Sequence, residues 1–293
     1  MSIKVTSIEG NRQLLDGGSM FGNAPRPLWE RWVKVDDLGR IELACRSLLI
    51  EYNDKKILLE AGIGAFFPPE LASRYGVTPV DQHVLLSELK KKNIQPEDID
   101  YVILSHLHFD HAGGLVPAYE EFSKSPRLIF SNAVHITGQT AWERAMNPHP
   151  RDRASFIPEI INLLKDNILV LSQDNPRQDL PQEIQSIFDF TISDGHTPGQ
   201  LLTVVKGESQ DLIFCGDLIP GTPWVNLPIT MGYDRFPELL IDEKKKLYES
   251  SNLESRLFFY THDDTYACSK IEINQKKKYA PVDPIKELNQ FEL

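Results

Sequence analysis

The stretch SHLHFDHAGG, residues 105–114, carries three of the chain's 8 histidines within six positions, with Asp110 among them. It follows directly on the apolar segment DIDYVILS, which is typical of a short buried strand. On extended backbone, residues i and i+2 point the same way, so His106 and His108 can converge on one ion. Asp110 and His111 can then present oxygen and nitrogen to a second point nearby. Imidazole and carboxylate ligands without thiolate favour zinc, with iron, manganese or cobalt as alternatives.

Two ions need more ligands than this stretch supplies. Three further polar residues each come just after a segment with strand character: His196 in SDGHTPG, Asp217 in DLIFCGD and His262 in RLFFYTHDD. The predicted arrangement has one ion held by His106, His108 and His196, the other held by Asp110, His111 and His262, and Asp217 bridging the two. His83, His135 and His149 lie outside this pattern and are interpreted as structural or surface residues.

Composition narrows the class of protein. With 293 residues, 41% hydrophobic and 25% charged, the chain reads as an ordinary globular protein. Its formal net charge of -11 opposes a nucleic-acid surface, because such binding depends on Lys and Arg neutralising phosphates. Three cysteines without metal-type spacing do not suggest a disulfide framework. No secretory-type apolar segment or membrane span is evident, so a cytoplasmic location is expected.

The rest of the chain alternates strands and helices. Residues 46–64 read as a hairpin around Asn53-Asp54, and residues 79–93 have helical spacing. Further strands are expected at RLIFS, NILVLS, LLTVV, DLIFCGD and RLFFYTH, and helices at 140–146, 155–165 and 237–251. This interleaving predicts an α/β layered architecture, here taken as a single domain over residues 1–293. The small residues Ala112, Gly113 and Gly114 are expected to let the backbone turn sharply after the histidines.

The series HLHFDHAGG, GHTPG, GD and a late His after an apolar strand resembles the metallo-β-lactamase superfamily, from about Ile57 to His262. That resemblance implies a four-layer αβ/βα sandwich with the metals at the edge where the strands end. The segments DGGSMFGNAPRPLWERW and GDLIPGTPWVNLPITMGYD are similar to the branch that holds acyl-homoserine lactonases and methyl-parathion-hydrolase-like phosphotriesterases.

Two positions depart from the family pattern. Glu60, in LLEAGIG, stands where the family commonly has the Asp of DTG, and this bears on the groups that orient the metal ligands. Pro220 stands three residues after Asp217, where acyl-homoserine lactonases carry a tyrosine.

The function expected from this site is a binuclear metal-dependent hydrolase that opens a lactone, ester or phosphotriester of a small, partly apolar substrate. Two close ions can lower the pKa of a bridging water to near neutrality. Asp110 and Asp217 are the expected catalytic carboxylates, with Asp110 also orienting the resulting hydroxide. Aromatic residues near the site are expected to wall the substrate cleft: Phe21, Trp29, Trp224, Tyr233 and Phe236.

The alternatives are a glyoxalase-II-like thioester hydrolase and a non-catalytic metal-binding member of the fold. The expected partner is a small-molecule substrate, with no nucleic acid and no membrane; a homodimer is a possible assembly.

Overall fold

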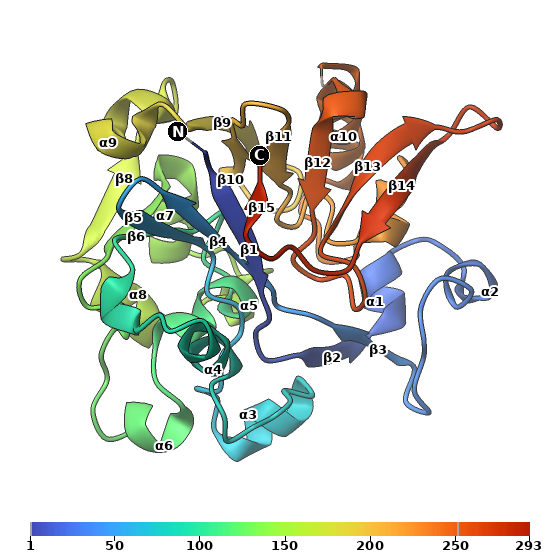
Figure 1. Ribbon diagram of the computed structural model, residues 1–293. Coiled ribbons are helices and arrows are strands. Elements are labelled where there is room, and N and C mark those ends of the chain that lie inside the picture. Colours follow the sequence, from blue (N-terminus) through green and yellow to red (C-terminus); the bar gives the residue numbers. More distant parts are fainter. Residues whose placement is uncertain (1, 251) are drawn as a thin grey trace.

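The computed structural model describes residues 2–250 and 252–293, and within them two mixed sheets pack face to face (Figure 1). The seven-stranded sheet runs in the order β15 (Phe291–Glu292), β1 (Lys4–Ile8), β4 (Ser47–Tyr52), β5 (Lys55–Leu59), β6 (Tyr101–Ile103), β7 (Val134–Gly138) and β8 (Ile168–Leu171). The six-stranded sheet runs in the order β14 (Tyr279–Ile285), β13 (Cys268–Ile273), β12 (Arg256–Phe259), β11 (Asp211–Phe214), β10 (Gln200–Val205) and β9 (Phe188–Ser193). A separate pair joins β2 (Gln13–Asp16) to β3 (Arg40–Leu43).

The inner strands of each sheet are buried on both faces, and this explains why they are apolar at nearly every position. In β4, Leu48 and Ile50 face the core between the sheets, whereas Leu49 faces a core on the outer side. In β11, Phe214 faces the same central core and Ile213 faces away from it. Because side chains alternate along a strand, a strand that is apolar at every position needs a cover on each side.

Helices supply those covers. The outer core of the seven-stranded sheet includes α4 (Val84–Lys91), α7 (Gln139–Met146) and α8 (Pro158–Leu164). The outer core of the six-stranded sheet includes α10 (Pro237–Ser250), α1 (Gly17–Phe21) and α2 (Arg26–Trp29). The layers are therefore helix, sheet, sheet, helix, and the predicted four-layer α/β sandwich is confirmed (Figure 1). Shorter helices are α3 (Pro69–Arg74), α5 (Phe109–Ala112), α6 (Tyr119–Phe122) and α9 (Gln182–Gln185).

Most predicted elements are present, with two kinds of error. The hairpin is β4 and β5, and the three later helices correspond to α7, α8 and α10; residue 251 of the last one lies outside the described residues. The first predicted helix starts at Val84 instead of residue 79, because residues 79–82 form bends and His83 has extended backbone. The predicted strand RLIFS is wrong: residues 127–131 form an irregular connection whose apolar side chains fill the outer core. The neighbouring strand is β7, where His135 and Thr137 break the apolar pattern.

The glycines after the histidine stretch serve a close approach between chain segments. A Cβ atom at Gly113 would lie 2.2 Å from the Ile63 carbonyl oxygen, and one at Gly114 would lie 2.0 Å from that of Ala61. Gly113 itself has an ordinary helical φ of -62°. Small residues are required here, as expected, but the reason is not a sharp turn of the backbone. They allow the backbones of two loops to make contact at the edge of the sheet.

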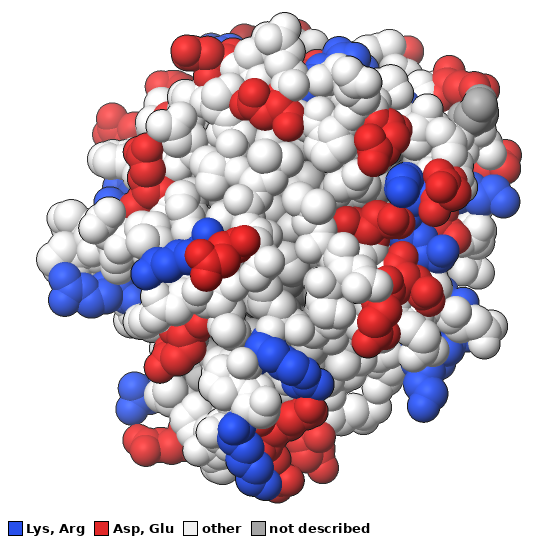
Figure 2. All heavy atoms as spheres, turned by 90° about the vertical axis from the view of Figure 1, so that its left-hand side faces the viewer, with Lys and Arg blue, Asp and Glu red and all other residues white. Residues whose placement is uncertain are grey.

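Among the described residues, no helix combines the length and apolar character needed to cross a bilayer. On the face seen in Figure 2, Lys and Arg side chains are interspersed with Asp and Glu side chains and do not gather into one basic patch.

Candidate metal centre

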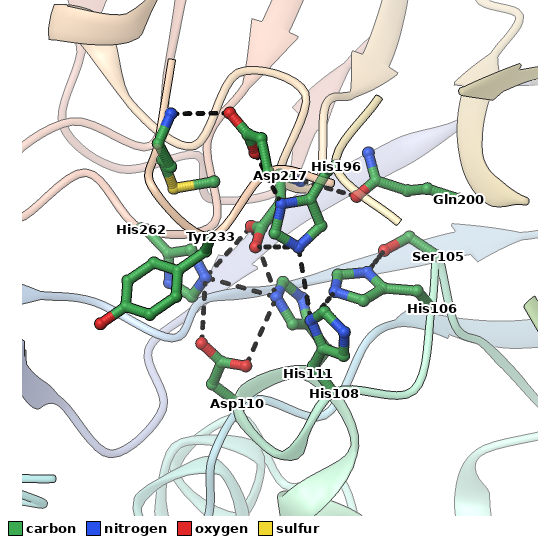
Figure 3. Close-up of polar contacts among 12 residues, drawn as sticks. Ser105, His106, His108, Asp110, His111, His196, Gln200, Asp217, Tyr233 and His262 are labelled. Atoms are coloured by element: carbon green, nitrogen blue, oxygen red, sulfur yellow. Dashed lines mark hydrogen bonds and ion pairs between the residues drawn. The ribbon is translucent and has the colours of Figure 1, made fainter. Parts of the chain in front are cut away.

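The polar residues singled out in the sequence meet at one edge of the sandwich. His106, His108, Asp110 and His111 follow β6, at the start of α5, while His196 lies between β9 and β10. Asp217 follows β11, and His262 follows the parallel neighbour β12. Strand ends that lie side by side thus carry residues separated by more than 150 positions to one place (Figure 3).

One group of ligand atoms forms around His108. Its Nδ1 lies 3.0 Å from His106 Nε2 and 3.3 Å from His196 Nε2. Asp217 Oδ2 lies 3.1 Å from the same His196 nitrogen. All four side chains are buried, and their ligand atoms are close enough to hold one ion.

A second group forms around His262. Its Nε2 lies 3.3 Å from His111 Nε2 and 3.6 Å from Asp110 Oδ2. The other oxygen of Asp217, Oδ1, lies 3.2 Å from His262 Nε2 and 3.4 Å from His111 Nε2. Asp217 therefore presents one oxygen to each group (Figure 3).

Acceptor groups behind the histidines determine which ring nitrogen carries the proton. His111 Nδ1 lies 2.7 Å from Glu60 Oε2, and His196 Nδ1 lies 2.9 Å from Asp234 Oδ1. His262 Nδ1 lies 2.6 Å from the Ala44 carbonyl oxygen. Because a carboxylate and a carbonyl only accept, each Nδ1 must donate, and a neutral ring then turns the lone pair of Nε2 toward the cluster.

These donor atoms fit divalent cations. Burial and the imidazoles of His111 and His108 lower the pKa of His106 well below its usual range, so that ring is neutral, as a ligand must be. Burial disfavours a charged carboxylate, yet His111, His196 and His262 hold the pKa of Asp217 well below its usual range. Asp217 Oδ1 accepts no hydrogen bond from any described residue. Against the effect of burial, Glu60 and Asp217 raise the pKa of His111, and Asp217 raises the pKa of His262, well above the usual range. A divalent cation would supply positive charge to these buried nitrogens and carboxylates in place of the ring protons.

A cavity of about 210 Å³ opens onto both groups. His108, Asp110, His196, Asp217 and His262 line its floor. Its walls combine apolar side chains with two arginines and include Leu15, Met20, Leu43, Tyr75, Phe109, Arg151, Met231, Tyr233 and Arg235. The site thus joins ligand atoms for two ions to a partly apolar pocket, the usual form of a small-molecule site.

Of the five aromatic residues expected to contact substrate, only Tyr233 lines this cavity. Phe21 stacks between Trp29, at a centroid distance of 5.3 Å, and Trp224, at 4.6 Å, and all three are buried. Phe236 is 52% exposed and lies off the cavity wall. The stacked rings form part of the outer core, because burial of large apolar area outweighs their proximity in sequence to the site.

The family model of the metallo-beta-lactamase superfamily matches residues 40–262. This range covers most of the chain and includes every residue of both ligand groups. The chain belongs to the metallo-beta-lactamase superfamily.

Several members of the superfamily resemble this chain. An N-acyl homoserine lactonase of Bacillus thuringiensis is 25% identical over 225 residues, which is 73% of this chain and 79% of that protein. The crystal structure of a probable metal-dependent hydrolase from Staphylococcus aureus superposes with a TM-score of 0.82 at 24% identity and covers 96% of this chain and 97% of that one. AidC, a dizinc quorum-quenching lactonase, superposes with a TM-score of 0.74 at 20% identity over 96% and 95% of the two chains. These structural likenesses show the shared fold.

Glu60 does support the ligands, although the superfamily commonly has Asp there. The residue is 1% exposed and adopts a left-handed φ of 62°. Besides accepting from His111, it accepts a hydrogen bond from the Ser105 hydroxyl. Ser105 Oγ in turn lies 2.9 Å from His106 Nδ1. Because the Ser105 hydroxyl donates its proton to Glu60, its oxygen accepts from His106 Nδ1. The Glu60 carboxylate therefore orients one histidine in each ligand group: His111 directly and His106 through Ser105.

Pro220 supplies no polar side chain at the position of the lactonase tyrosine. Its carbonyl oxygen accepts a hydrogen bond of 2.9 Å from the His262 backbone N–H. Pro220 is buried and does not line the cavity. Its observed role is to hold the loop that carries His262.

Several residues at the site were missed by sequence reasoning. Gln13 Nε2 donates to Asp110 Oδ2 at 2.8 Å, and Asp234 accepts from both His196 and the Met231 N–H. Arg151 and Arg235 line the cavity. None of these positions has a local pattern that marks it, because each reaches the site from a separate loop or strand. Ser105, in contrast, is adjacent to the histidines and could have been considered.

Proposed function

We propose that this protein is a hydrolase that uses two divalent ions, zinc being the expected metal, to cleave a lactone, ester or phosphotriester bond of a small, partly apolar molecule. The observation that carries the proposal is Asp217, which turns one oxygen to each of two His-containing ligand groups on the floor of one cavity. The similarity to N-acyl homoserine lactonases supports the lactone as a substrate class.

The ligands proposed for one ion are His106, His108 and His196, and those for the other are Asp110, His111 and His262, with Asp217 shared. Two such ions, when bound, would supply Lewis acidity toward the scissile carbonyl or phosphoryl group and would make a water more acidic.

The chain's own groups would then orient the reactants. Gln13 donates to Asp110 Oδ2, which fixes the plane of that carboxylate at the cavity floor. With a 14% exposed side chain, Asp110 is accessible to a water molecule and is suited to accept its hydrogen bond. Apolar wall residues such as Met20, Leu43 and Phe109 would pack against the acyl part of the substrate.

Neither Pro220 nor Tyr233 is placed to protonate the leaving group. Pro220 has no proton to give, and in Figure 3 the Tyr233 hydroxyl lies on the side of its ring away from the ligand groups. Burial raises the pKa of Tyr233, which makes it a weaker acid. We therefore infer that neither residue protonates the leaving group, and we expect turnover to depend steeply on leaving-group acidity.

A series of esters with graded leaving groups tests this inference through kcat/KM. Aryl esters and aryl phosphotriesters should react much faster than alkyl esters, and Tyr233→Phe should cost less than ~10-fold, below the usual range for a general acid. A flat dependence in the wild type that becomes steep in Tyr233→Phe would identify Tyr233 as the acid.

The proposed function as a whole is tested by metal analysis and a hydrolysis screen. Protein purified without chelator or reconstituted with zinc should approach two metals per chain, and His196→Ala should lower that number. A stoichiometry that stays at or below one in the intact protein would refute the binuclear centre. Lactones, aryl esters, thioesters and phosphotriesters form the screen. Preference for thioesters would favour the glyoxalase-II-like alternative, and no turnover with two metals bound would favour a non-catalytic role.

A further inference from the structure

Two arginines line the cavity beside the candidate metal ligands, and the Arg235 backbone N–H donates to the His196 carbonyl oxygen at 3.1 Å. Arg235 lies in the loop just before α10, and Arg151 lies between α7 and α8. Arg151 Nη2 donates to the Gly232 carbonyl oxygen at 3.2 Å, so it contacts the loop that holds Arg235. A pocket for a wholly apolar substrate would have no use for two cationic side chains, which lose hydration when a ligand fills it.

The guanidinium of Arg235 is only partly satisfied. Its Nε donates to the Tyr233 carbonyl oxygen at 2.9 Å, and its Nη2 donates to the same oxygen. Its Nη1 is buried and has no hydrogen-bond partner within residues 2–250 and 252–293. Buried N–H groups are nearly always paired, so an unpaired donor in a residue that lines the cavity points to a missing acceptor.

The nearby carboxylates are engaged elsewhere. Asp234 accepts from His196 Nδ1 with one oxygen and from the Met231 N–H with the other. Asp152 Oδ2 accepts from Arg144 through both Nε, at 2.9 Å, and Nη2, at 2.8 Å. Asp152 Oδ1 is itself without a partner in the described part of the chain, so Arg235 does not turn toward it. Neither Arg151 nor Arg235 forms an ion pair with a described carboxylate.

We propose that Arg235, assisted by Arg151, binds an oxyanion of the substrate, a carboxylate or a phosphate, that is separate from the bond that is cleaved. A guanidinium is the side chain best matched to such a group, because its parallel N–H donors fit two oxygens at once. The proposal rests on the proposed hydrolase function and specifies its substrate: a small lactone or ester with an apolar body and an anionic end. Burial and the neighbouring Arg151 lower the pKa of Arg235, and Asp152 and Asp234 oppose that shift.

The first test compares two esters with one leaving group and one chain length, 4-nitrophenyl hexanoate and mono-4-nitrophenyl adipate. The measured quantity is the ratio of kcat/KM for the anionic ester to that for the neutral ester. Arg235→Met should lower this ratio by about 10-fold or more, the scale of a charge-assisted hydrogen bond. Arg235→Lys should restore part of it, and Arg151→Met should lower it less. The matched control is Arg153→Met, since Arg153 is exposed in the same segment and does not line the cavity.

An unchanged ratio in both Arg235→Met and Arg151→Met would overturn the proposal. An equal fall in the Arg153→Met control would also overturn it, because the effect would then come from general surface charge. Raising ionic strength should weaken the preference for the anionic ester in the wild type more than in Arg235→Met.

The second test is independent of turnover. Calorimetry on the metal-loaded protein compares hexanoate, adipate and 6-phosphonohexanoate, which share one carboxylate and differ at the other end. About 10-fold tighter binding of adipate identifies a carboxylate site, and a greater gain for the phosphonate identifies a phosphate site. The gain should vanish in Arg235→Met. Equal affinities for all three in the wild type would overturn the anion site, whereas a failure to hydrolyse any ester would refute the proposed function and leave this measurement valid.

Discussion

Replacing Glu60 by Gln tests whether one buried carboxylate sets the proton positions of two ligand histidines. Glu60 Oε2 accepts from His111 Nδ1 at 2.7 Å, and Oε1 accepts from the Ser105 hydroxyl, whose oxygen lies 2.9 Å from His106 Nδ1. Gln has nearly the same shape, but it has one acceptor oxygen and one donor NH₂. The change therefore removes one acceptor and leaves the packing almost intact.

Either orientation of the new amide disturbs one histidine. If its oxygen faces His111, its NH₂ donates to Ser105, which must then donate to His106 Nδ1. The His106 proton moves to Nε2, the atom that faces the ligand group. If the amide is flipped, its NH₂ meets His111 Nδ1 and moves that ring's proton to Nε2 instead. In both cases one imidazole can no longer offer its lone pair to an ion.

Loss of such an orienting partner typically costs about 10–100-fold in metal affinity or activity, which corresponds to ~1.4–2.8 kcal/mol. The assay is a zinc titration in competition with a chromophoric chelator, with circular dichroism to check the fold. Glu238→Gln, at an exposed position in α10, is the matched control and should bind zinc like the wild type. Wild-type affinity for both ions in Glu60→Gln would show that the Glu60 carboxylate does not determine the tautomers.

Three further outcomes are expected. Asp217→Asn should lower turnover by at least ~10²-fold, since an amide cannot carry the charge that two cations share, and near wild-type activity in the folded variant would contradict this. Arg46→Met should destabilise the protein by roughly 3 kcal/mol in urea unfolding, because the buried guanidinium donates to three carbonyls of the loop 260–266; an unchanged midpoint would argue against this role. Burial lowers the pKa of His83 from 6.5 to about 4, so the unfolded chain takes up this proton first as pH falls. The resulting stability is complete above pH 6.5 and declines toward pH 4 by roughly 3 kcal/mol. His83→Gln should flatten that slope relative to the wild type, and parallel curves would refute the assignment.

Much of the candidate metal centre was predictable from the sequence because its signals are local. The pairing of His106 with His108 follows from the two-residue repeat of an extended segment. The later ligands follow from their place at the ends of apolar strands, and strand ends meet at one edge of a sheet. The layered fold was predictable for a similar reason, since strands that are apolar at every position need a cover on both faces.

Only the tertiary structure decided what surrounds those ligands. An aromatic ring such as Phe21 has the same apolar character in a core as on a cavity wall, so its sequence position could not separate the two. Gln13, Asp234 and Arg235 reach the site from segments far apart in the chain, and no residue spacing records such contacts. The sequence by itself thus indicated the layers and the polar residues that gather at one edge of the sandwich, because both depend on local periodicity and side-chain chemistry. Tertiary packing decided the tautomers of the histidines, the residues that line the pocket and the partly unpaired guanidinium of Arg235. Each of these depends on which distant groups the fold brings within a few ångströms of one another.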